Sequence, residues 1–464
     1  MKTLENICLL FPRIKIPTGD PPLGLAYLAS YIRARKKINI SIIDAGFHRS
    51  MKKVMKIIDS INPDVLGIFF DTMVYNDAIK IAKCLKKSDR LIIAGGPHAS
   101  VMPESVVDYA DVVIIGEGEE TFGEVIENGS LTINESFKRI NGLCYKLYGE
   151  IIFTGERPHI LNLDTLPFPA FDLLEMELYV KRWHYLDCVD MGLCGTNLIT
   201  SRGCPFGCTY CQPTLRKMFG QRLCSHSPGY IVDGIKYLVK KFDISSIFFH
   251  DDTITSDNKW LDEFCSLMIS AGAGIVWGCN TRADVLEQEL LKKMYSAGCR
   301  KFHIGAESAS TRILKEIYRK GIMPEDVEKM VASAKKAGIK CFCFFMLGAP
   351  TETYKEMWQT GKFACRLPVD EVSFSITTPL PGTYIYQTIS SDKRYTLSSD
   401  FSKYNYYSKR AFYEPGVSSK KIKFYQIFYL LMFYSNPKRW LYLIRHFISF
   451  KGIMKLLRKI LRSI

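Results

Sequence analysis

The feature that most constrains the fold of this chain is an alternation of short apolar runs with longer amphipathic stretches, which occurs twice. One series fills residues 1–130 and the other begins near residue 197. Aliphatic side chains occupy both parities of the runs, which is typical of strands in a parallel sheet covered on both faces. Because 464 residues exceed what one hydrophobic core usually serves, the sequence predicts an α/β protein with more than one domain.

The first series predicts a five-stranded, doubly wound parallel sheet. Its strands are expected at Ile7–Phe11, Ile38–Asp44, Val65–Phe70, Leu91–Ala94 and Val112–Ile115. Such a sheet binds its ligand outside the carboxyl ends of the strands, where the strand order reverses. In the loops at that edge we expect the following residues to bind a cofactor: Pro22, Gly24, Gly95, Gly96, Gly116, Glu117 and Gly118. As an alternative, the glycines serve only as tight turns from strand to helix.

The second series predicts a partial (β/α)6 barrel. Its strands are expected at Asn197–Ser201, Ser246–His250, Ile275–Asn280, Lys301–Gly305, Lys340–Met346 and Glu371–Thr377. In barrels of parallel strands, the chemistry lies at the C-terminal ends of the strands. The expected domains are residues 1–135 for the N-terminal sheet, 136–195 for a proline-containing linker, 196–385 for the barrel and 386–464 for a small, mainly helical region.

The net charge of +15 is concentrated at one end of the chain. From Pro415 to Ile464 there are eleven Lys and Arg residues and no Asp or Glu, so the rest of the chain has 51 basic and 47 acidic residues. A nearly neutral body argues against a nucleic-acid-binding surface, and we expect no nucleic-acid partner.

Near its end the chain alternates apolar and basic positions at helical spacing. The apolar set is Leu456, Leu457, Ile460 and Leu461, opposite Lys455, Arg458, Lys459 and Arg462. This pattern predicts an interfacial helix that contacts a membrane surface, or else a basic helix packed on the barrel.

Fifteen cysteines are scattered along the chain. Glu5 interrupts the apolar run that a secretory signal would need. Many thiols without an export signal indicate a reducing, cytoplasmic compartment and argue against a disulfide framework.

Three of these cysteines, Cys204, Cys208 and Cys211, follow the first strand of the second series on a loop that contains Gly203 and Gly207. Thiolates at this spacing can converge on one metal centre. Four cysteines would close a structural zinc site or an ordinary iron–sulfur cluster, whereas three leave one iron without a protein ligand. That iron can chelate the amino and carboxylate groups of a bound molecule. The alternatives are a zinc site completed by a distant Cys or His, and three unrelated buried thiols.

With these cysteines the sequence resembles the radical S-adenosylmethionine (SAM) superfamily, and more narrowly its branch with an N-terminal cobalamin-binding domain. The resemblance covers about residues 5–390. It also rests on motifs after the later strands: Phe249-His250-Asp251-Asp252, Asn280-Thr281-Arg282-Ala283-Asp284, Gly305-Ala306-Glu307-Ser308, Met346-Leu347-Gly348-Ala349-Pro350-Thr351-Glu352-Thr353 and Thr378-Pro379-Leu380-Pro381-Gly382-Thr383. It implies a [4Fe–4S] cluster on the three cysteines, SAM and cobalamin as cofactors.

Positions within these motifs imply roles. We expect Tyr210 to lie beside the adenine of SAM, and Glu307 and Ser308 to hydrogen-bond its ribose or methionine end. Arg282 is expected to pair with the SAM carboxylate through two parallel hydrogen bonds. Gly348 and Pro350 are expected to let the backbone approach the adenine.

Glu307 and Asp252 are the expected catalytic residues, since both follow strands whose ends face the chemistry. For Asp251 and Asp252 the alternative is a helix N-cap with a neighbouring surface charge.

One departure from other cobalamin proteins concerns the lower axial ligand of the cobalt. The Asp-x-His-x-x-Gly pattern that supplies such a histidine is absent, because Asp44 and His48 are four residues apart. His98 is the other histidine near the cofactor edge and is expected to bind the cofactor, more readily as a hydrogen-bonding group than as a cobalt ligand.

The resemblance implies an enzyme that abstracts hydrogen from an unactivated carbon and functionalises it, in the first place by methylation. The substrate would be a small or lipid-like molecule, and an external donor such as flavodoxin or ferredoxin would supply electrons. One alternative is a radical cyclisation or rearrangement without methyl transfer, like that of anaerobic tetrapyrrole cyclases. Another is a non-catalytic corrinoid or iron–sulfur carrier, against which the ordered barrel motifs argue.

Overall fold

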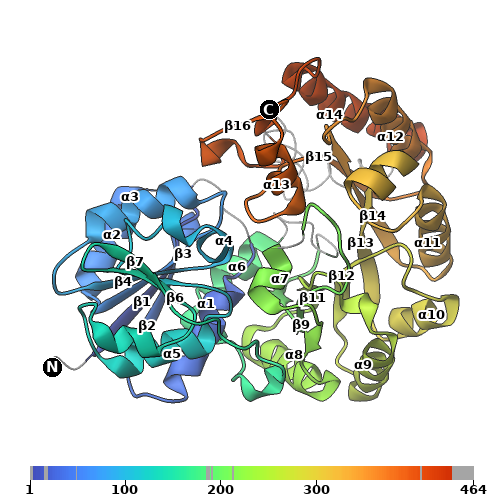
Figure 1. The fold of residues 1–464 in the computed structure, drawn as a ribbon. Helices are drawn as coiled ribbons and strands as arrows, with labels where there is room; N and C mark the ends of the chain where they lie inside the picture. The colour runs from blue at the N-terminus through green and yellow to red at the C-terminus, as the bar shows by residue number, and fades with distance from the viewer. Residues whose placement is uncertain are drawn as a thin grey trace. The chain divides into compact units, whose positions relative to one another are not determined.

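The computed structural model describes residues 4–14, 19–48, 50–183, 189, 192–211, 214–407 and 410–440. The chain forms two compact units. One comprises Met1–Leu178 with Pro213–Cys224, and the other comprises Tyr179–Gln212 with Ser225–Ile464. Each unit contains its own parallel sheet with helices packed on it (Figure 1).

The N-terminal sheet has seven strands: β1 (Asn6–Phe11), β2 (Asn39–Asp44), β3 (Val65–Phe69), β4 (Leu91–Gly95), β5 (Val112–Ile114), β6 (Leu143–Leu147) and β7 (Glu150–Phe153). Their order is β2-β1-β3-β4-β5-β6-β7. The first five strands pair in parallel, and β6 and β7 are antiparallel additions. This order confirms the doubly wound fold and places the switch point between β1 and β3.

Helices cover both faces of this sheet. They are α1 (Leu23–Arg33), α2 (Met51–Ile61), α3 (Tyr75–Leu85), α4 (Pro97–Val101), α5 (Glu119–Asn128) and α7 (Thr214–Phe219). Alternate side chains of β1 divide the core, because Ile7 and Leu9 pack with α1 and α5. Cys8 and Leu10 pack with α2 and α3 on the other face. This explains the continuous apolar runs seen in the sequence.

The linker expected at residues 136–195 is partly wrong, because β6 and β7 form a hairpin that extends the sheet beyond β5. Its turn has positive φ at Tyr148 and Gly149. Cys144 and Tyr145 of β6 are fully buried. Strands of five and four residues are too short to show a clear periodicity, and a two-stranded addition of this kind becomes stable only on an existing sheet.

The second unit contains six parallel strands: β8 (Gly195–Leu198), β11 (Ser246–Phe249), β12 (Val276–Thr281), β13 (Cys299–Glu307), β14 (Lys340–Leu347) and β15 (Glu371–Ile376). Their order is β15-β14-β13-β12-β11-β8, so β8 and β15 are the two edges of an open sheet. The crossover helices are α8 (Pro228–Phe242), α9 (Asn258–Ala271), α10 (Gln288–Ser296), α11 (Pro324–Lys336) and α12 (Tyr354–Arg366), followed by α13 (Tyr384–Ser391). The architecture is the expected partial barrel.

Local sequence signals set the ends of the crossover helices. α8 begins with Ser227, whose hydroxyl accepts from a backbone N–H, and ends at Asp243 in the left-handed conformation. α9 is capped by Asp257, whose carboxylate accepts from two backbone N–H groups. Thr353 and Glu356 form a reciprocal capping box at the start of α12. These caps fix where each helix begins and therefore which residues remain in the loops at the strand ends.

The C-terminal region ends, within the described residues, in α14 (Ser419–Tyr434) and a short segment that reaches Trp440. α14 packs on β15 and α12. None of the helices in the described part of the chain combines the length and hydropathy needed to cross a membrane. The interfacial helix predicted near the end of the chain lies outside the described residues.

Candidate active site at the cysteine loop

The three cysteines lie on the loop that follows β9 (Ser201–Arg202). Gly203 has a φ of 86°, so the chain can turn directly before Cys204. Cys208 is buried and the other two thiols are partly buried. The N–H of Cys211 donates to the carbonyl of Cys208 at 3.1 Å, which curls the second half of the loop.

Thr209 fixes this loop to the rest of the barrel unit. Its N–H donates to the carbonyl of Tyr318 at 2.9 Å and its hydroxyl donates to the carbonyl of Ile317 at 2.5 Å. The carbonyl of Thr209 accepts from the N–H of Ile385 at 3.2 Å. Hydrogen bonds to two distant segments therefore hold the cysteine loop in place through the protein's own backbone.

Three cysteine thiols on one loop are the donor set of an iron–sulfur cluster with one open iron. No three Cys, His, Asp or Glu side chains within the described residues converge closely enough to hold one metal ion. Zinc draws sulfurs to about 2.3 Å from one centre, whereas a cluster distributes thiolates over separate irons. Burial raises the pKa of Cys204 to about 11 and the pKa of Cys211 well above its usual value. Such thiols become ligands when a positive metal centre compensates the thiolate charge.

Asp251 holds the entry to the cysteine loop. Its Oδ1 accepts from the N–H of Thr200 at 2.9 Å, from the hydroxyl of Thr200 at 2.7 Å and from the hydroxyl of Ser201 at 2.5 Å. The first strand ends at Leu198 rather than at Ser201 as expected, and these bonds hold the segment that follows it. The helix-cap alternative for Asp251 is wrong, since Asp257 caps α9.

Asp252 presents an accessible side chain beside this loop. Desolvation of the carboxyl group and then the charge of the neighbouring Asp251 raise its pKa to about 7. The charge of Asp252 in turn raises the pKa of Cys204 and Cys211, so the carboxyl group lies near the thiols. A carboxyl group with a raised pKa is a candidate catalytic acid or base. Its catalytic role stays a prediction.

Glu307, Lys320 and Tyr210 form a buried polar cluster beside the cysteine loop. Glu307 Oε1 lies 2.6 Å from Lys320 Nζ and accepts from the Tyr210 hydroxyl at 3.1 Å. Lys320 Nζ also donates to the Tyr210 hydroxyl at 3.1 Å. Because Tyr210 stands between the second and third cysteines, this cluster links the end of β13 to the cysteine loop.

The backbone of β13 is shaped to hold this cluster. Glu307 has a φ of 63°, a left-handed conformation that is rare outside glycine and common at functional sites. Gly305 leaves the space that the ion pair fills, because a Cβ there would lie 2.5 Å from Lys320 Nζ. Lys320 was not predicted from the sequence, since it lies in a loop 13 residues beyond its partner.

Arg282 follows β12 and lies against the cysteine loop. Its Nη1 is 3.7 Å from Cys208 Sγ, and its guanidinium lies 3.7 Å from the centre of the Phe206 ring. Asp284 takes the two parallel hydrogen bonds, from Nε at 3.0 Å and from Nη2 at 2.9 Å. The structure therefore differs from the expectation that Arg282 pairs with a SAM carboxylate, because that side of the guanidinium is already occupied.

Ser308 does not reach the Glu307 cluster. Its hydroxyl is 3.2 Å from the hydroxyl of Thr360 in α12 and accepts from the N–H of Ser310 at 3.1 Å. Successive residues at a strand end point to opposite sides, so Ser308 faces the helix layer while Glu307 faces the cysteine loop. Its expected role in cofactor binding is not supported by this position.

The loop after β14 is held by Glu352. Its Oε2 accepts from the N–H of Gly348 at 2.6 Å and from the N–H of Ala349 at 3.0 Å. Gly348 has a φ of 76°, and Pro350 is buried. Burial raises the pKa of Glu352 to about 8. The loop therefore has a defined shape, and contact of Gly348 and Pro350 with an adenine stays a prediction.

In the N-terminal unit, the loops at the carboxyl edge of the sheet present bare backbone. A Cβ at Gly24 would meet no heavy atom within 4 Å, and one at Gly95 would meet a single side-chain atom at 3.9 Å. At Gly116 the nearest atoms are backbone oxygens at 3.8 and 3.9 Å. Pro22 precedes α1 and Gly118 precedes α5. A bound molecule can approach the backbone at Gly24 and Gly95, as expected at the carboxyl edge of a doubly wound sheet.

Gly96 and Glu117 instead make contacts within the protein. A Cβ at Gly96 would lie 2.7 Å from the carbonyl oxygen of Phe70, and its φ of 108° also requires glycine. Glu117 Oε2 accepts from the N–H of Ile160 at 2.9 Å and lies 3.5 Å from His159 Nδ1. For Gly96 the tight-turn alternative describes the structure.

His98 is enclosed in the N-terminal core. Its Nδ1 is 3.0 Å from the Thr72 hydroxyl and its Nε2 is 3.1 Å from the Ser105 hydroxyl. Only 1% of the residue is exposed, and burial lowers its pKa to about 4. Both ring nitrogens face protein hydroxyls, so this position does not support the expectation that His98 binds the cofactor, whether as a hydrogen-bonding group or as a cobalt ligand.

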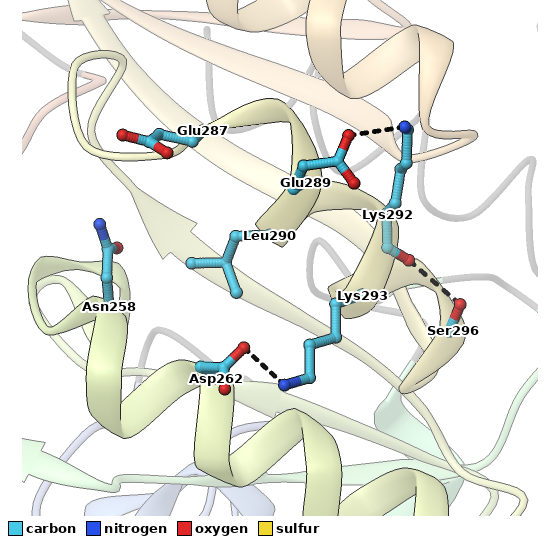
Figure 2. A pocket seen from close by; sticks show the side chains of 8 residues that line it. All are labelled: Asn258, Asp262, Glu287, Glu289, Leu290, Lys292, Lys293 and Ser296. Atoms are coloured by element: carbon cyan, nitrogen blue, oxygen red, sulfur yellow. Dashed lines mark hydrogen bonds and ion pairs between the residues drawn. The ribbon is translucent and has the colours of Figure 1, made fainter.

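A separate recess of about 600 Å³ lies between α9 and α10 (Figure 2). Charged residues dominate its lining. One ion pair joins the two helices across it, Asp262 with Lys293 at 2.5 Å, and a second lies within α10, Glu289 with Lys292 at 2.8 Å. The recess belongs to two crossover helices and not to the strand ends that carry the candidate site. Its paired charges offer no group for the chemistry.

Comparison with known proteins agrees with both halves of this arrangement. Residues 198–364 match the radical SAM superfamily, and residues 13–126 match the B12 binding domain. The uncharacterized methyltransferase PH0819 of Pyrococcus horikoshii is 35% identical over 398 residues, which is 83% of this chain and 83% of that protein. This chain belongs to the radical SAM superfamily, in the branch with a B12-binding domain.

One further relative and one solved structure are similar to this radical SAM protein. The anaerobic magnesium-protoporphyrin IX monomethyl ester cyclase of Rubrivivax gelatinosus is 28% identical over 398 residues, 83% of this chain and 69% of that protein. The structure of OxsB, a cobalamin-dependent SAM radical enzyme solved with aqua-cobalamin and SAM, superimposes with a TM-score of 0.76 at 17% identity. The superposition covers 98% of this chain and 72% of OxsB, which confirms the fold.

The cofactors of this radical SAM enzyme are a [4Fe–4S] cluster, SAM and cobalamin. As a member of the superfamily it acts on a small-molecule substrate and takes electrons from an external donor.

Proposed function

We propose that this protein is a methyltransferase that adds a methyl group to an unactivated carbon. The observation that carries the proposal is that one chain combines a three-cysteine loop at the ends of barrel strands with an open glycine edge on a doubly wound sheet. The 35% identity to a protein named as a methyltransferase supports methyl transfer over other outcomes. When bound, the cluster and SAM supply hydrogen-abstraction chemistry and cobalamin supplies a methyl group.

In this proposal Cys204, Cys208 and Cys211 hold the cluster. Glu307 accepts a hydrogen bond from the amino group of SAM. Lys320, whose Nζ lies 2.6 Å from Glu307 Oε1, binds the carboxylate of SAM next to that amino group. Both groups are buried, so their interactions with a zwitterionic ligand are stronger than in water.

Arg282 acts on the cluster rather than on SAM. Its Nη1–H group lies 3.7 Å from Cys208 Sγ, where it can donate a hydrogen bond to a cluster-bound sulfur. Asp252 provides a titratable carboxyl group on the accessible side of the loop, where it can take or give a proton. Tyr210 and the loop of Gly348 and Pro350 are proposed to border the adenine.

An anaerobic assay tests the methyltransferase proposal. The reconstituted full chain is incubated with cobalamin, reductant, SAM and candidate substrates, and both 5′-deoxyadenosine and S-adenosylhomocysteine are measured. Methylation gives both products in equal amounts per turnover. If neither product forms although the cluster is intact, the proposal is contradicted.

A pair of cysteine variants tests the cluster assignment. Cys208→Ala should abolish 5′-deoxyadenosine formation and the iron–sulfur absorbance. Cys84→Ala is the matched control, because Cys84 is an exposed thiol of the N-terminal unit. Equal loss in both variants, or persistence of the product in Cys208→Ala, would place the cluster elsewhere.

A second candidate function is a radical cyclisation without methyl transfer. The 28% identity to the Rubrivivax gelatinosus cyclase over 398 residues favours this alternative. It predicts 5′-deoxyadenosine without S-adenosylhomocysteine in the same assay. The ratio of the two products therefore decides between the two functions.

We also propose an electron donor and a contact with the membrane surface. A cytoplasmic flavodoxin or ferredoxin is the proposed donor, since small soluble carriers reach a partly buried cluster loop. The eleven basic residues without an acid from Pro415 to Ile464 support peripheral contact with an anionic membrane surface, which would suit a lipid-like substrate. Replacing a chemical reductant by purified flavodoxin should sustain turnover; a chain that accepts electrons only from the chemical reductant would contradict this choice of donor.

A further inference from the structure

α14 is apolar on both of its sides, although only one side packs on the protein. Ile422 and Tyr429 are fully buried against the barrel unit. On the opposite side Phe424 is 59% exposed and Leu431 is 66% exposed. A helix that is apolar all round is normally enclosed on all sides, and large exposed apolar side chains in a contiguous group mark an interaction site.

Aromatic stacking extends this surface from α14 to α12. The Phe424 and Phe428 rings stack with centroids 5.7 Å apart, and Trp358 of α12 stacks on Phe428 at 6.0 Å. Trp358 is 37% exposed. We call the surface formed by Trp358, Phe424, Phe428 and Leu431 the aromatic face. Its rings support one another, so the face is a rigid element rather than a set of independent side chains.

Basic side chains surround the aromatic face. Lys420 and Lys438 are exposed at the start of α14 and beyond its end. Lys362 Nζ lies 5.4 Å from the centre of the Trp358 ring, and Lys421 Nζ lies 3.8 Å from the centre of the Tyr354 ring. The basic residues therefore lie on both helices that form the face.

Two acidic residues in the segments that carry or precede the aromatic face are held in ion pairs. Glu356 of α12 pairs with Arg312 at 2.8 Å, and Glu414 pairs with Arg410 at 2.7 Å. The sequence after Pro415 contributes further Lys and Arg residues and no acid. The charge at this face is therefore positive.

We propose that the aromatic face is a docking surface for an anionic lipid bilayer, on which α14 lies parallel to the membrane plane. Aromatic and aliphatic side chains enter the boundary between headgroups and acyl chains, and the lysines around them contact anionic headgroups. A spanning arrangement is ruled out, because the 16 residues of α14 extend about 24 Å and the hydrocarbon core is about 30 Å thick.

The charge selects the bilayer over a second copy of this chain. Two aromatic faces in contact would bring the lysines around each face together without a compensating carboxylate, and like charges at an interface are unfavourable. An anionic bilayer complements the same charges. Docking does not depend on the reaction that the enzyme catalyses. It rests on the peripheral membrane contact proposed above and names the surface that makes that contact.

Vesicle co-sedimentation tests the docking proposal with the full-length chain. Vesicles of phosphatidylcholine alone are compared with vesicles that also contain phosphatidylglycerol. The chain should bind the anionic vesicles, and binding should weaken as salt rises. The double variant Phe424→Ser/Leu431→Ser should lower the partition coefficient by about tenfold per side chain. Tyr148→Ser is the matched control, since Tyr148 is 87% exposed in the N-terminal unit, and it should bind as the unchanged chain does.

A second pair of variants guards against misfolding. Lys420→Glu/Lys438→Glu changes only exposed side chains and should reduce binding to anionic vesicles without shifting the melting temperature. All variants should keep 5′-deoxyadenosine formation with a soluble reductant, so loss of docking and loss of the proposed chemistry remain distinguishable.

Three results would overturn the proposal. The first is equal binding of Phe424→Ser/Leu431→Ser and the unchanged chain. The second is binding that disappears when residues 441–464 are removed and does not respond to changes in the aromatic face. The third is a dimer in light scattering that the Phe424 and Leu431 changes convert to a monomer, which would assign the face to a second copy.

Discussion

Glu307 shows how the surroundings of one side chain prepare the candidate site. Its left-handed backbone costs about 1–3 kcal/mol and persists only when neighbouring contacts enforce it. Here the contacts are the Lys320 ion pair, the Tyr210 hydroxyl and the space above Gly305. The carboxylate is therefore oriented before any ligand binds, which lowers the cost of ordering it on binding.

Changing Lys320→Met should lower the free energy of unfolding by about 3 kcal/mol, because it leaves the Glu307 carboxylate buried and unpaired. Urea unfolding of the protein without cofactors measures this loss. The double variant Lys320→Met/Glu307→Gln should recover most of the stability. If the double variant is as unstable as the single one, the ion pair is not the cause.

Changing Glu307→Gln should weaken SAM binding by about 10–100-fold, the range expected for loss of a charged hydrogen-bond partner. Isothermal titration calorimetry of the reconstituted protein measures the Kd. Glu150→Gln is the matched control, because Glu150 is exposed in β7 of the N-terminal unit. An unchanged Kd in Glu307→Gln would remove this carboxylate from the SAM site.

Glu352 should make stability depend on pH. Burial raises its pKa in the folded protein to about 8, above the usual value of 4.5. The folded chain therefore keeps a proton that the unfolded chain loses, and stability should fall as pH rises from about 4.5 to about 8. The loss amounts to a few kcal/mol at most.

The variant Glu352→Gln isolates this effect, since its amide oxygen can still accept from the N–H groups of Gly348 and Ala349. Urea unfolding at several pH values should show a flatter profile for the variant. Parallel profiles for both proteins would show that another group titrates in this range.

Among elements, the contact between the β14 loop and the C-terminal region has the clearest consequence. Arg410 Nη2 donates to the carbonyl of Ala349 at 3.3 Å, and the N–H of Thr351 donates to Glu414 Oε1 at 2.9 Å. A Cβ at Gly348 would lie 2.8 Å from Ile422 of α14. The C-terminal region therefore holds a loop that is proposed to border SAM.

Changing Arg410→Met should raise the KM for SAM by about tenfold, because the loop loses one of its supports. The kcat at saturating SAM should change much less, since Arg410 does not belong to the Glu307 cluster. Steady-state formation of 5′-deoxyadenosine gives both constants. A fall in kcat at unchanged KM would contradict a positioning role.

For the whole molecule, the two units have separate sheets and cores. The cluster loop belongs to one unit and the glycine edge to the other, so the two cofactors should bind independently. Cys208→Ala should therefore bind cobalamin with the affinity of the unchanged chain while lacking the cluster. Absorbance titration with cobalamin measures this. A strong loss of cobalamin affinity would show that the two sites are coupled.

Much of the architecture was predictable, because strands of a parallel sheet with helices on both faces appear in the sequence as continuous apolar runs. The strand ranges around Ile7–Phe11 and Glu371–Thr377 were predicted to within one residue. The first barrel strand was misplaced, because the backbone at Thr200 bonds to Asp251, 51 residues later, instead of continuing the strand. The β6–β7 hairpin was missed because it is stable only on the edge of β5.

The sequence by itself determined the metal-binding chemistry and the layered fold, because cysteine spacing and apolar periodicity act over short stretches of chain. Only the tertiary structure decided which polar groups meet. It brought Lys320 to Glu307, gave Asp284 the guanidinium of Arg282, enclosed His98, and left one side of α14 exposed. These outcomes depend on which strand ends and helix faces become neighbours. Residues that are far apart in the chain carry no local pattern that predicts which of them will meet.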